Sequence, residues 1–381
     1  MYKKALAIGM IALLFLSACP KTKQLENMGI INTRGTDLVS DESNTIETTL
    51  IVFQFDPQSK SITKTLYGKG NTIKAAREDA NRSSSFTLTP GQIRLELFGK
   101  ELAEKGIVEM VSALVRDARV SDTMLLAVTN HTAKEVLTKG QQVTTINVGQ
   151  YLHGVLQREY DDQTLPKVAL QDFAHIYSDP GIDPVLPIIG FKRDEPVKTS
   201  IALFQGDRYV EELSLKDGFL INLFQERIKN APLSLKLPLE PFKKYMEHQD
   251  LQSPVNDENL FVRLGVKGKS KTKLTDFEKK HFQTDIKIKV IMDEVSELIS
   301  MKDEKAGDLL EKEIGKKLEK NYETLLKKTQ EAGADPFGFG NIYGTNRKAA
   351  DLTKKEWHEI YPSISVDFNV HVELLNYGTI K

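Results

Sequence analysis

The chain has 381 residues, of which 40% are apolar and 28% charged, a composition typical of folded proteins that argues against disorder along the whole length. With 52 basic and 53 acidic side chains the formal net charge is −1, so no general attraction to nucleic acid is expected. The length is sufficient for two or three domains, and the single cysteine excludes an internal disulfide and a cysteine-based zinc site.

The first twenty residues have the layout of a secretory signal. Lys3 and Lys4 form a positive start, and residues 5–16 form an uncharged apolar run. This run is shorter than the ~20 residues that a membrane-spanning helix needs, but it suits the apolar region of a signal peptide. No later stretch of the chain reaches that length without charges. We therefore expect a signal peptide over residues 1–18 and no membrane-spanning helix after it.

The segment Leu16-Ser17-Ala18-Cys19 resembles the bacterial lipobox. The resemblance implies that cleavage leaves Cys19 as the new N-terminus and that its thiol carries a diacylglyceryl group. Two buried acyl chains are enough to hold a protein stably on a bilayer. The alternative is an ordinary secretory leader in which this cysteine falls by chance. We favour lipid attachment at Cys19, on the outer face of the cell membrane, because the single cysteine stands at the required position.

Strands and helices alternate along the first half of the chain. Runs rich in Thr, Val, Ile and Phe, or with alternating apolar residues, predict strands at 45–56, 61–67, 93–98 and 124–128. Helical spacing predicts helices at 72–81, at 101–115 and from 133 onward. Such alternation is typical of a mixed α/β unit, here over roughly residues 25–190. Residues 178–187 contain three prolines and one glycine, which predicts a loop or linker.

The second half begins with a hairpin signal and closes with a strand–helix–strand pattern. Residues 200–204 and 208–213 read as strands around a Gly-Asp turn, and Ser214 with Asp217 predicts the start of a helix over 218–229. Strict alternation predicts a strand at 283–293, and helical spacing predicts a long helix at 305–330. A short helix at 352–361 and a strand at 364–374 follow.

These patterns predict an α+β protein with two to three mixed α/β domains after a lipoprotein signal peptide. We expect an N-terminal mixed α/β domain over residues 19–190 and a middle hairpin-helix domain over 191–275. A C-terminal domain of strand, long helix and strand would occupy residues 276–381.

Several motifs that suggest enzyme chemistry are incomplete. Gly268-Lys269-Ser270 resembles the end of a phosphate-binding loop, but Arg263 stands where that loop needs its first glycine. Gly338, Gly340 and Gly344 lack the spacing of a dinucleotide loop, so we interpret them as a turn that packs two aromatic residues. The seven histidines show no metal-ligand spacing, and no GxSxG motif occurs. We therefore expect no catalytic residue, metal or cofactor, although a site assembled from distant residues would leave no such pattern.

The C-terminal region carries a resemblance to a known family. Its motifs are Lys328-Thr329-Gln330, Asp335-Pro336-Phe337-Gly338-Phe339-Gly340, Trp357 and Tyr361-Pro362-Ser363-Ile364-Ser365-Val366. The hairpin at 202–210 and the segment at 102–107 agree with the same pattern. Together with the lipobox, the order and spacing of these motifs resemble the Ger(x)C family, the lipoprotein C subunits of spore germinant receptors.

The resemblance implies a function that composition does not. Members are non-enzymatic subunits on the outer surface of the inner spore membrane, and they act with two membrane-spanning subunits, A and B, to trigger germination in response to nutrients. The resemblance assigns no residue as a contact for the nutrient. Two other classes of protein fit a lipid anchor: a solute-binding protein that serves a transporter, and an anchored hydrolase. Two similar α/β lobes would indicate the first, and a deep cleft with convergent carboxylates or histidine the second.

Three aromatic residues of the C-terminal motifs have two interpretations. Phe337, Phe339 and Trp357 could form an aromatic patch for docking a partner, since such residues often dominate protein interfaces. The other interpretation, which we favour, is that they fill the core of the last domain.

Overall fold

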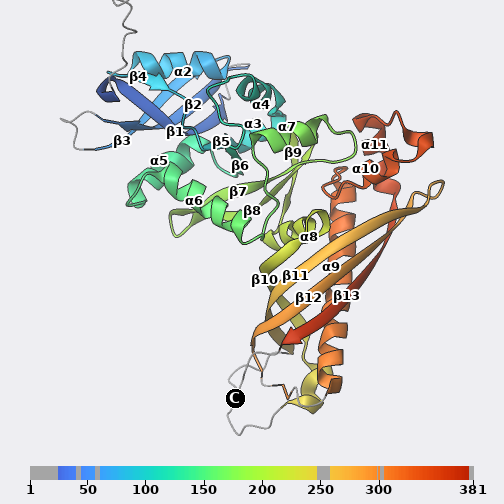
Figure 1. Cartoon of the computed structure of the whole chain (residues 1–381). Helices are drawn as coiled ribbons and strands as arrows, with labels where there is room; N and C mark the ends of the chain where they lie inside the picture. The colour runs from blue at the N-terminus through green and yellow to red at the C-terminus, as the bar shows by residue number, and fades with distance from the viewer. Residues whose placement is uncertain are drawn as a thin grey trace, which may run out of the picture.

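The computed structural model describes residues 25–39, 44–55, 61–246, 258–297, 299–300 and 304–376. The expected signal peptide and the expected lipid site Cys19 lie outside these residues. The described chain forms two β-sheets with helices packed on them, and Figure 1 shows the sheets at opposite ends of an elongated body. The α+β class with more than one mixed α/β part is confirmed.

Sheet 1 has nine strands in the order β3-β2-β1-β5-β6-β7-β8-β9, with β4 paired to β1. The central strands β1, β5, β6 and β7 run parallel, whereas β2 and β3 on one side and β8 and β9 on the other are antiparallel. The strands are β1 (Met28–Leu38), β2 (Ile46–Gln54), β3 (Thr63–Gly70), β4 (Thr87–Thr89), β5 (Leu95–Gly99), β6 (Leu125–Thr129), β7 (Val185–Lys192), β8 (Glu195–Gln205) and β9 (Arg208–Leu213).

Helices cover both faces of sheet 1, because its parallel strands are apolar on both sides. One layer contains α2, α3, α4 and α7, and the other contains α5 and α6 (Figure 1). Their bounds are α2 (Ile73–Arg82), α3 (Lys100–Lys105), α4 (Val108–Val115), α5 (Ala133–Val143), α6 (Val148–Asp161) and α7 (Leu170–Ser178). A short 3₁₀ turn, η1 (Leu25–Asn27), precedes β1.

Sheet 2 has four strands in the order β10-β11-β12-β13, and the long helix α9 (Glu304–Glu331) packs on one of its faces (Figure 1). Because β13 runs parallel to β12, the chain needs a crossover between them, and α9 supplies it. The strands are β10 (Ile228–Pro238), β11 (Asn259–Asp276), β12 (His281–Val295) and β13 (Ser365–Asn376). The remaining elements are η2 (Glu240–Tyr245), α10 (Phe339–Gly344), η3 (Arg347–Ala349), α11 (Lys354–Ile360) and η4 (Tyr361–Ser363).

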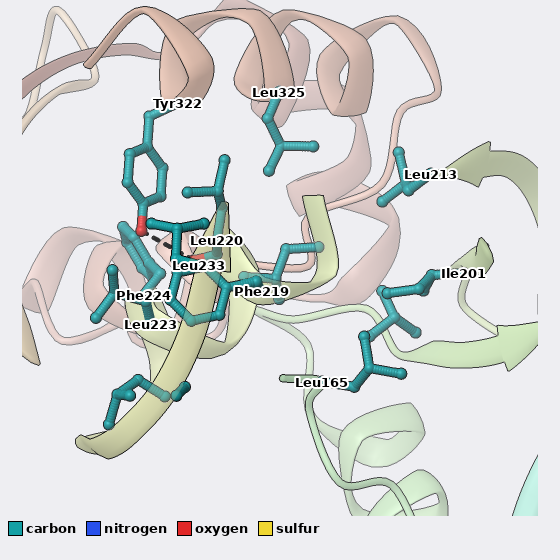
Figure 2. Packing of buried hydrophobic residues seen from close by; sticks show 14 of the residues in the cluster. Leu165, Ile201, Leu213, Phe219, Leu220, Leu223, Phe224, Leu233, Tyr322 and Leu325 are labelled. Atoms are coloured by element: carbon teal, nitrogen blue, oxygen red, sulfur yellow. Dashed lines mark hydrogen bonds between the residues drawn. The ribbon is translucent and has the colours of Figure 1, made fainter. Parts of the chain in front are cut away.

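Helix α8 (Leu215–Gln225) joins the two sheets. Every residue from Gly218 to Phe224 is buried, so this part of the helix is enclosed on all sides. Figure 2 shows its leucine and phenylalanine side chains between residues of the sheet 1 side, such as Ile201, and residues of α9, such as Tyr322. The Tyr322 hydroxyl donates a hydrogen bond of 3.0 Å to the Leu220 carbonyl. One continuous hydrophobic core therefore extends from sheet 1 to sheet 2.

The helix predicted over 218–229 begins earlier than expected, at Leu215, and ends earlier, at Gln225, because β10 begins at Ile228. Its predicted cap is confirmed: Ser214 Oγ accepts the N–H of Asp217, and the Asp217 carboxylate accepts the N–H of Ser214 at 2.9 Å. Gly218 lies inside the helix because a Cβ there would stand 1.9 Å from Ile201 Cδ1. The glycine thus allows close packing of α8 against β8 rather than marking the helix start.

The single helix predicted over 101–115 is wrong, because the structure contains two helices, α3 and α4. Between them Gly106 has a φ of +125°, a conformation that glycine adopts without strain. Asp207, in the turn between β8 and β9, accepts the N–H groups of Ile107 and Val108 at 3.1 and 3.0 Å. A contact about a hundred residues away in the sequence therefore breaks the helix.

Other predicted elements agree within a few residues, but the sequence patterns did not identify β1, β4, α6, α7, β7, β10, β11 or α10. The predicted linker over 178–187 is a loop only as far as residue 184, because β7 begins at Val185. Sheet 1 continues to Leu213, past the predicted domain boundary at residue 190, so the segment 191–275 contributes strands to both sheets. The division into three domains stays a prediction.

Candidate functional site

The aromatic residues of the C-terminal motifs lie in the core. Phe337, Phe339 and Trp357 are 4%, 0% and 0% exposed. Phe339 contacts the rings of Phe224 and Phe282, each with 5.1 Å between centroids. These side chains therefore offer no docking surface in this structure, and the core interpretation accounts for their positions.

The polar centre of this region is Asp335, the first residue of the Asp-x-Phe-Gly-Phe-Gly motif. Its side chain is fully buried. One carboxylate oxygen accepts the N–H groups of Phe337 and Gly338 at 2.9 and 3.0 Å. The other oxygen accepts the N–H of Gly340 at 3.1 Å and the indole N–H of Trp357 at 3.0 Å. Asp335 thus fixes the motif into one tight turn and ties it to α11.

A second buried aspartate, Asp183, links this turn to sheet 1. Its carboxylate accepts the N–H of Asp335 at 2.9 Å and the N–H of Gly206, in the β8–β9 turn, at 2.8 Å. On its outer side it lies 2.9 Å from Nε2 of His358 and 3.9 Å from Nζ of Lys354. We use the name aspartate junction for five residues: Asp183, Asp335, Lys354, Trp357 and His358.

Burial dominates the electrostatics of the aspartate junction. It raises the pKa of the Asp335 carboxyl from its usual 3.8 to about 7; the N–H donors oppose this rise, and the charge of Asp183 adds to it. Burial also lowers the pKa of the Lys354 ammonium, against the attraction of Asp183. Lys354 donates to the carbonyls of Ile176 and Ile182 at 3.1 and 3.0 Å, so it holds the loop before β7 as well.

Steric constraints explain why the motif has glycine at positions 338 and 340. Gly338 adopts a left-handed φ of +80° at the start of α10. A Cβ on Gly340 would lie 2.5 Å from Cα of Gly181 and 2.7 Å from the Trp357 ring. Only glycine at position 340 lets α10, α11 and the loop before β7 approach so closely.

The arrangement suits a structural joint better than catalysis. Each oxygen of Asp335 accepts two N–H groups, so neither has a lone pair left to bind a substrate. Among the residues that the structure describes, no group of three or more His, Cys, Asp or Glu side chains is placed to hold a metal ion. The Gly268-Lys269-Ser270 segment lies in the middle of the extended strand β11, not in a loop.

A second buried charge pair, Arg34 with Glu96, lies inside sheet 1. The Nε of Arg34 is 2.7 Å from Oε2 of Glu96, and the Thr36 hydroxyl donates to the same carboxylate at 2.6 Å. Both charged residues are at most 1% exposed. They lie on the adjacent parallel strands β1 and β5, so the pair fixes the alignment of these strands rather than facing a ligand.

Sequence reasoning identified the motif around Asp335 but not Asp183, Lys354 or His358. Asp183 stands 152 residues before its partner, in the proline-rich loop that the sequence marks only as a linker. A single sequence contains no signal for such a long-range contact.

Two family models match the chain. The model "Spore germination protein N-terminal domain" matches residues 21–191, and "Spore germination B3/ GerAC like, C-terminal" matches residues 199–378. The chain belongs to the GerAC family of spore germination proteins. The family resemblance expected from the motifs is therefore confirmed.

Individual relatives agree with the family. The chain is 25% identical over 374 residues to "Spore germination protein GerQC" of Bacillus cereus, with 98% of each chain covered. It is 22% identical over 315 residues to "Putative spore germination protein YfkR" of Bacillus subtilis (strain 168), covering 80% of this chain and 75% of that protein. The fold resembles the crystal structure of the GerBC protein, with a TM-score of 0.53 and 16% identity over 90% of this chain and 97% of that one.

Proposed function

We propose that this GerAC family member is the C subunit of a nutrient germinant receptor. In this role it acts without catalysis, together with two membrane-spanning subunits, A and B, to trigger spore germination. The observation that carries the proposal is the match of both family models, which together span nearly all of the chain after the expected signal peptide. The similarity to the GerQC protein over 98% of both chains supports it.

The proposal includes a lipid anchor on Cys19 that holds the protein on the outer face of the membrane. The lipobox-like segment before Cys19 supports this anchor. In the part of the chain that the structure describes, no helix has the length and apolar character needed to cross a bilayer. An anchor confines a protein to the plane of its partners and so raises its effective concentration near them.

The two alternative classes receive less support. A solute-binding protein would be expected to have two similar α/β lobes, but sheet 1 and sheet 2 differ in strand number, order and direction. A hydrolase would need convergent catalytic groups in a cleft. The buried carboxylate of Asp335 is instead saturated by hydrogen bonds from its own chain.

The decisive experiment is deletion of the gene, followed by germination assays against a panel of amino acids, sugars and nucleosides. We expect the response to one nutrient class to be lost and to return when the gene is restored. Heat-activated spores that respond normally to the whole panel, in a strain without other receptors of this family, would contradict the proposed role.

The anchor has its own test, in Cys19→Ala. We expect this variant to leave the membrane fraction after a high-salt wash, whereas Lys21→Ala, which leaves the lipobox-like segment intact, should stay. Mass spectrometry of the mature N-terminus gives the direct measurement. An unmodified thiol, or a start site after Cys19, would contradict lipid attachment.

A further inference from the structure

Among the residues that the structure describes, no helix covers one of the two faces of sheet 2. Helix α9 packs on the other face, where the even-numbered residues of β11 and β12, such as Leu264 and Ile288, are buried. The alternate residues of these strands are exposed or partly exposed and point away from α9. Six exposed lysines on this side form what we call the lysine face: Lys267, Lys269, Lys271 and Lys273 of β11, and Lys287 and Lys289 of β12.

The register of the strands places like charges opposite each other. Lys267 pairs with Lys289, and Lys269 pairs with Lys287. Like charges directly opposite on neighbouring strands destabilise a sheet, so the fold alone gives no reason for this arrangement. Local choices that oppose stability are expected at functional sites.

Few acidic groups neutralise the lysine face. Lys289 lies 2.7 Å from Glu373 of β13, and Lys271 stands opposite Asp285 of β12. Side-chain hydrogen bonds from Asn369 and Gln283 lower the pKa of the Asp285 carboxyl, and the charge of Lys273 adds to this effect. Lys267, Lys269 and Lys287 form no ion pair with any residue that the structure describes. The centre of the face therefore carries uncompensated positive charge.

The same centre is hollowed. A hollow of ≈ 390 Å³ is lined by both lysine pairs and by Arg227, His371 and Glu373, with Gly268 and Ile288 among the other lining residues. Four lysines and one arginine thus line the hollow against a single carboxylate. The hollow has the charge and room to accept phosphate groups, which Lys binds as a point charge.

Exposed apolar side chains accompany the charges on this face. Phe261, Ile291 and Leu375 are 46%, 42% and 50% exposed, and they lie on β11, β12 and β13 in outward positions. Lysines together with exposed apolar residues on one surface are typical of proteins that lie against an anionic membrane interface. The lipid anchor proposed on Cys19 would keep this face beside a bilayer, which favours a membrane over an acidic protein surface as its partner.

We propose that the lysine face binds the phosphate headgroups of an anionic bilayer surface. This inference rests on the proposed function, because the anchor on Cys19 is what keeps the face beside a membrane. Cys19 precedes Leu25 by six residues, which span at most roughly 20 Å when extended. Since sheet 2 lies at the far end of the body from the start of β1, the protein must lie lengthwise along the bilayer for both contacts to form (Figure 1).

The test uses the chain from residue 19 onward with Cys19→Ala, so that binding does not depend on lipid. It is mixed with vesicles of phosphatidylglycerol and phosphatidylcholine in equal parts, or of phosphatidylcholine alone, and the bound fraction is measured by co-sedimentation. We expect binding to the anionic vesicles only. Raising the salt from about 0.1 M to about 1 M shortens the screening length from about 10 Å to about 3 Å and should release the protein.

The variant Lys267→Glu/Lys269→Glu/Lys287→Glu should lower the partition onto anionic vesicles about a hundredfold or more, at roughly fivefold for each lysine removed. The matched control is Lys312→Glu/Lys320→Glu/Lys355→Glu, which changes net charge equally at exposed positions on α9 and α11. It should change the partition less than about threefold. Thermal unfolding shows whether each variant is folded. If the triple variant of the lysine face is not folded, the single variant Lys269→Glu takes its place.

Four outcomes would overturn the proposal. The first two are equal binding to both kinds of vesicle and an equal loss of binding in the control variant. The third is displacement from the vesicles by inorganic phosphate at matched ionic strength. The fourth is binding to a purified acidic protein without any binding to vesicles. Phosphate displacement would assign the hollow to a small free anion, and the last outcome would assign the face to a protein partner. None of these results bears on the germination or Cys19 tests, so failure of this inference is distinguishable from failure of the proposed function.

Discussion

Asp183 and Asp335 bind each other twice across the boundary between the two halves of the molecule. The N–H of Asp335 donates to the Asp183 carboxylate at 2.9 Å, and the N–H of Asp183 donates to the Asp335 carbonyl at 2.7 Å. Each residue also organises its own side of the boundary, since Asp183 holds the β8–β9 turn and Asp335 holds the glycine-rich turn before α10. The two aspartates therefore couple the folding of two regions that are distant in sequence.

Asp335→Asn should destabilise the protein by about 2–4 kcal/mol. Asparagine has one oxygen acceptor, and its amide group would face N–H donors of the turn that now bind the carboxylate. Urea unfolding gives the measurement. Asp367→Asn, at an exposed position on β13, is the control and should change stability by less than about 0.5 kcal/mol. Equal stability of the two variants would contradict the role given to Asp335.

The stability that depends on Asp335 should fall as pH rises. Its pKa is about 7 in the folded chain and usually 3.8, so between about 4 and about 7 the folded chain keeps a proton that the unfolded chain has lost. The difference in unfolding free energy, wild type minus Asp335→Asn, should therefore shrink from about pH 5 to about pH 8.

Asp117 supplies a control of opposite sign. Hydrogen bonds and charge from Arg119 lower the pKa of its carboxyl to about 2. The difference between wild type and Asp117→Asn should stay constant above about pH 4 and fall below it, as the folded carboxylate becomes protonated. If the difference for Asp335→Asn were flat or grew with pH, the raised pKa would be wrong.

Gly340→Ala should destabilise the protein by about 2 kcal/mol or more. The added methyl group would meet the Gly181 backbone at 2.5 Å, and backbone cannot move aside as a flexible side chain can. Gly154→Ala is the matched control, since nothing lies within 4 Å of a Cβ at this exposed position of α6. Alanine there should stabilise the helix by up to about 1 kcal/mol. Thermal unfolding of both variants gives the measurement. A Gly340→Ala protein as stable as the wild type would show that the added methyl group meets no steric clash.

Phe339→Ala should cost about 3–5 kcal/mol, because the ring is fully buried between Phe224 and Phe282. At temperatures where the variant is still folded, we expect it to assemble with the receptor as the wild type does. A variant that unfolds like the wild type but no longer assembles would instead show that Phe339 contacts a partner.

The sequence predicted the elements whose pattern is local. Alternating residues identified β12, helical spacing identified α9, and Ser214 with Asp217 identified the start of α8. Strand β1 was missed because its buried positions include Arg34 and Asp37, which interrupt any apolar pattern. Their partners, Glu96 on β5 and the N-terminus of α5, come from elsewhere in the chain.

The candidate site was predictable only in part, for the same reason. The motif around Asp335 is a local sequence and stands out as one. The residues that complete the aspartate junction are joined to it only by the fold. The lysines of β11 are visible as a cluster in the sequence, but their pairing with Lys287 and Lys289 depends on the register of two strands.

The burial of residues 218–224 of α8 limits how this protein can move. A hinge between the two sheets would have to expose or repack Leu220 and its neighbours, which touch both sides of the shared core (Figure 2). Close-packed interiors transmit strain instead of absorbing it. Any movement that leaves this core intact therefore changes the orientation of the whole body and not its shape.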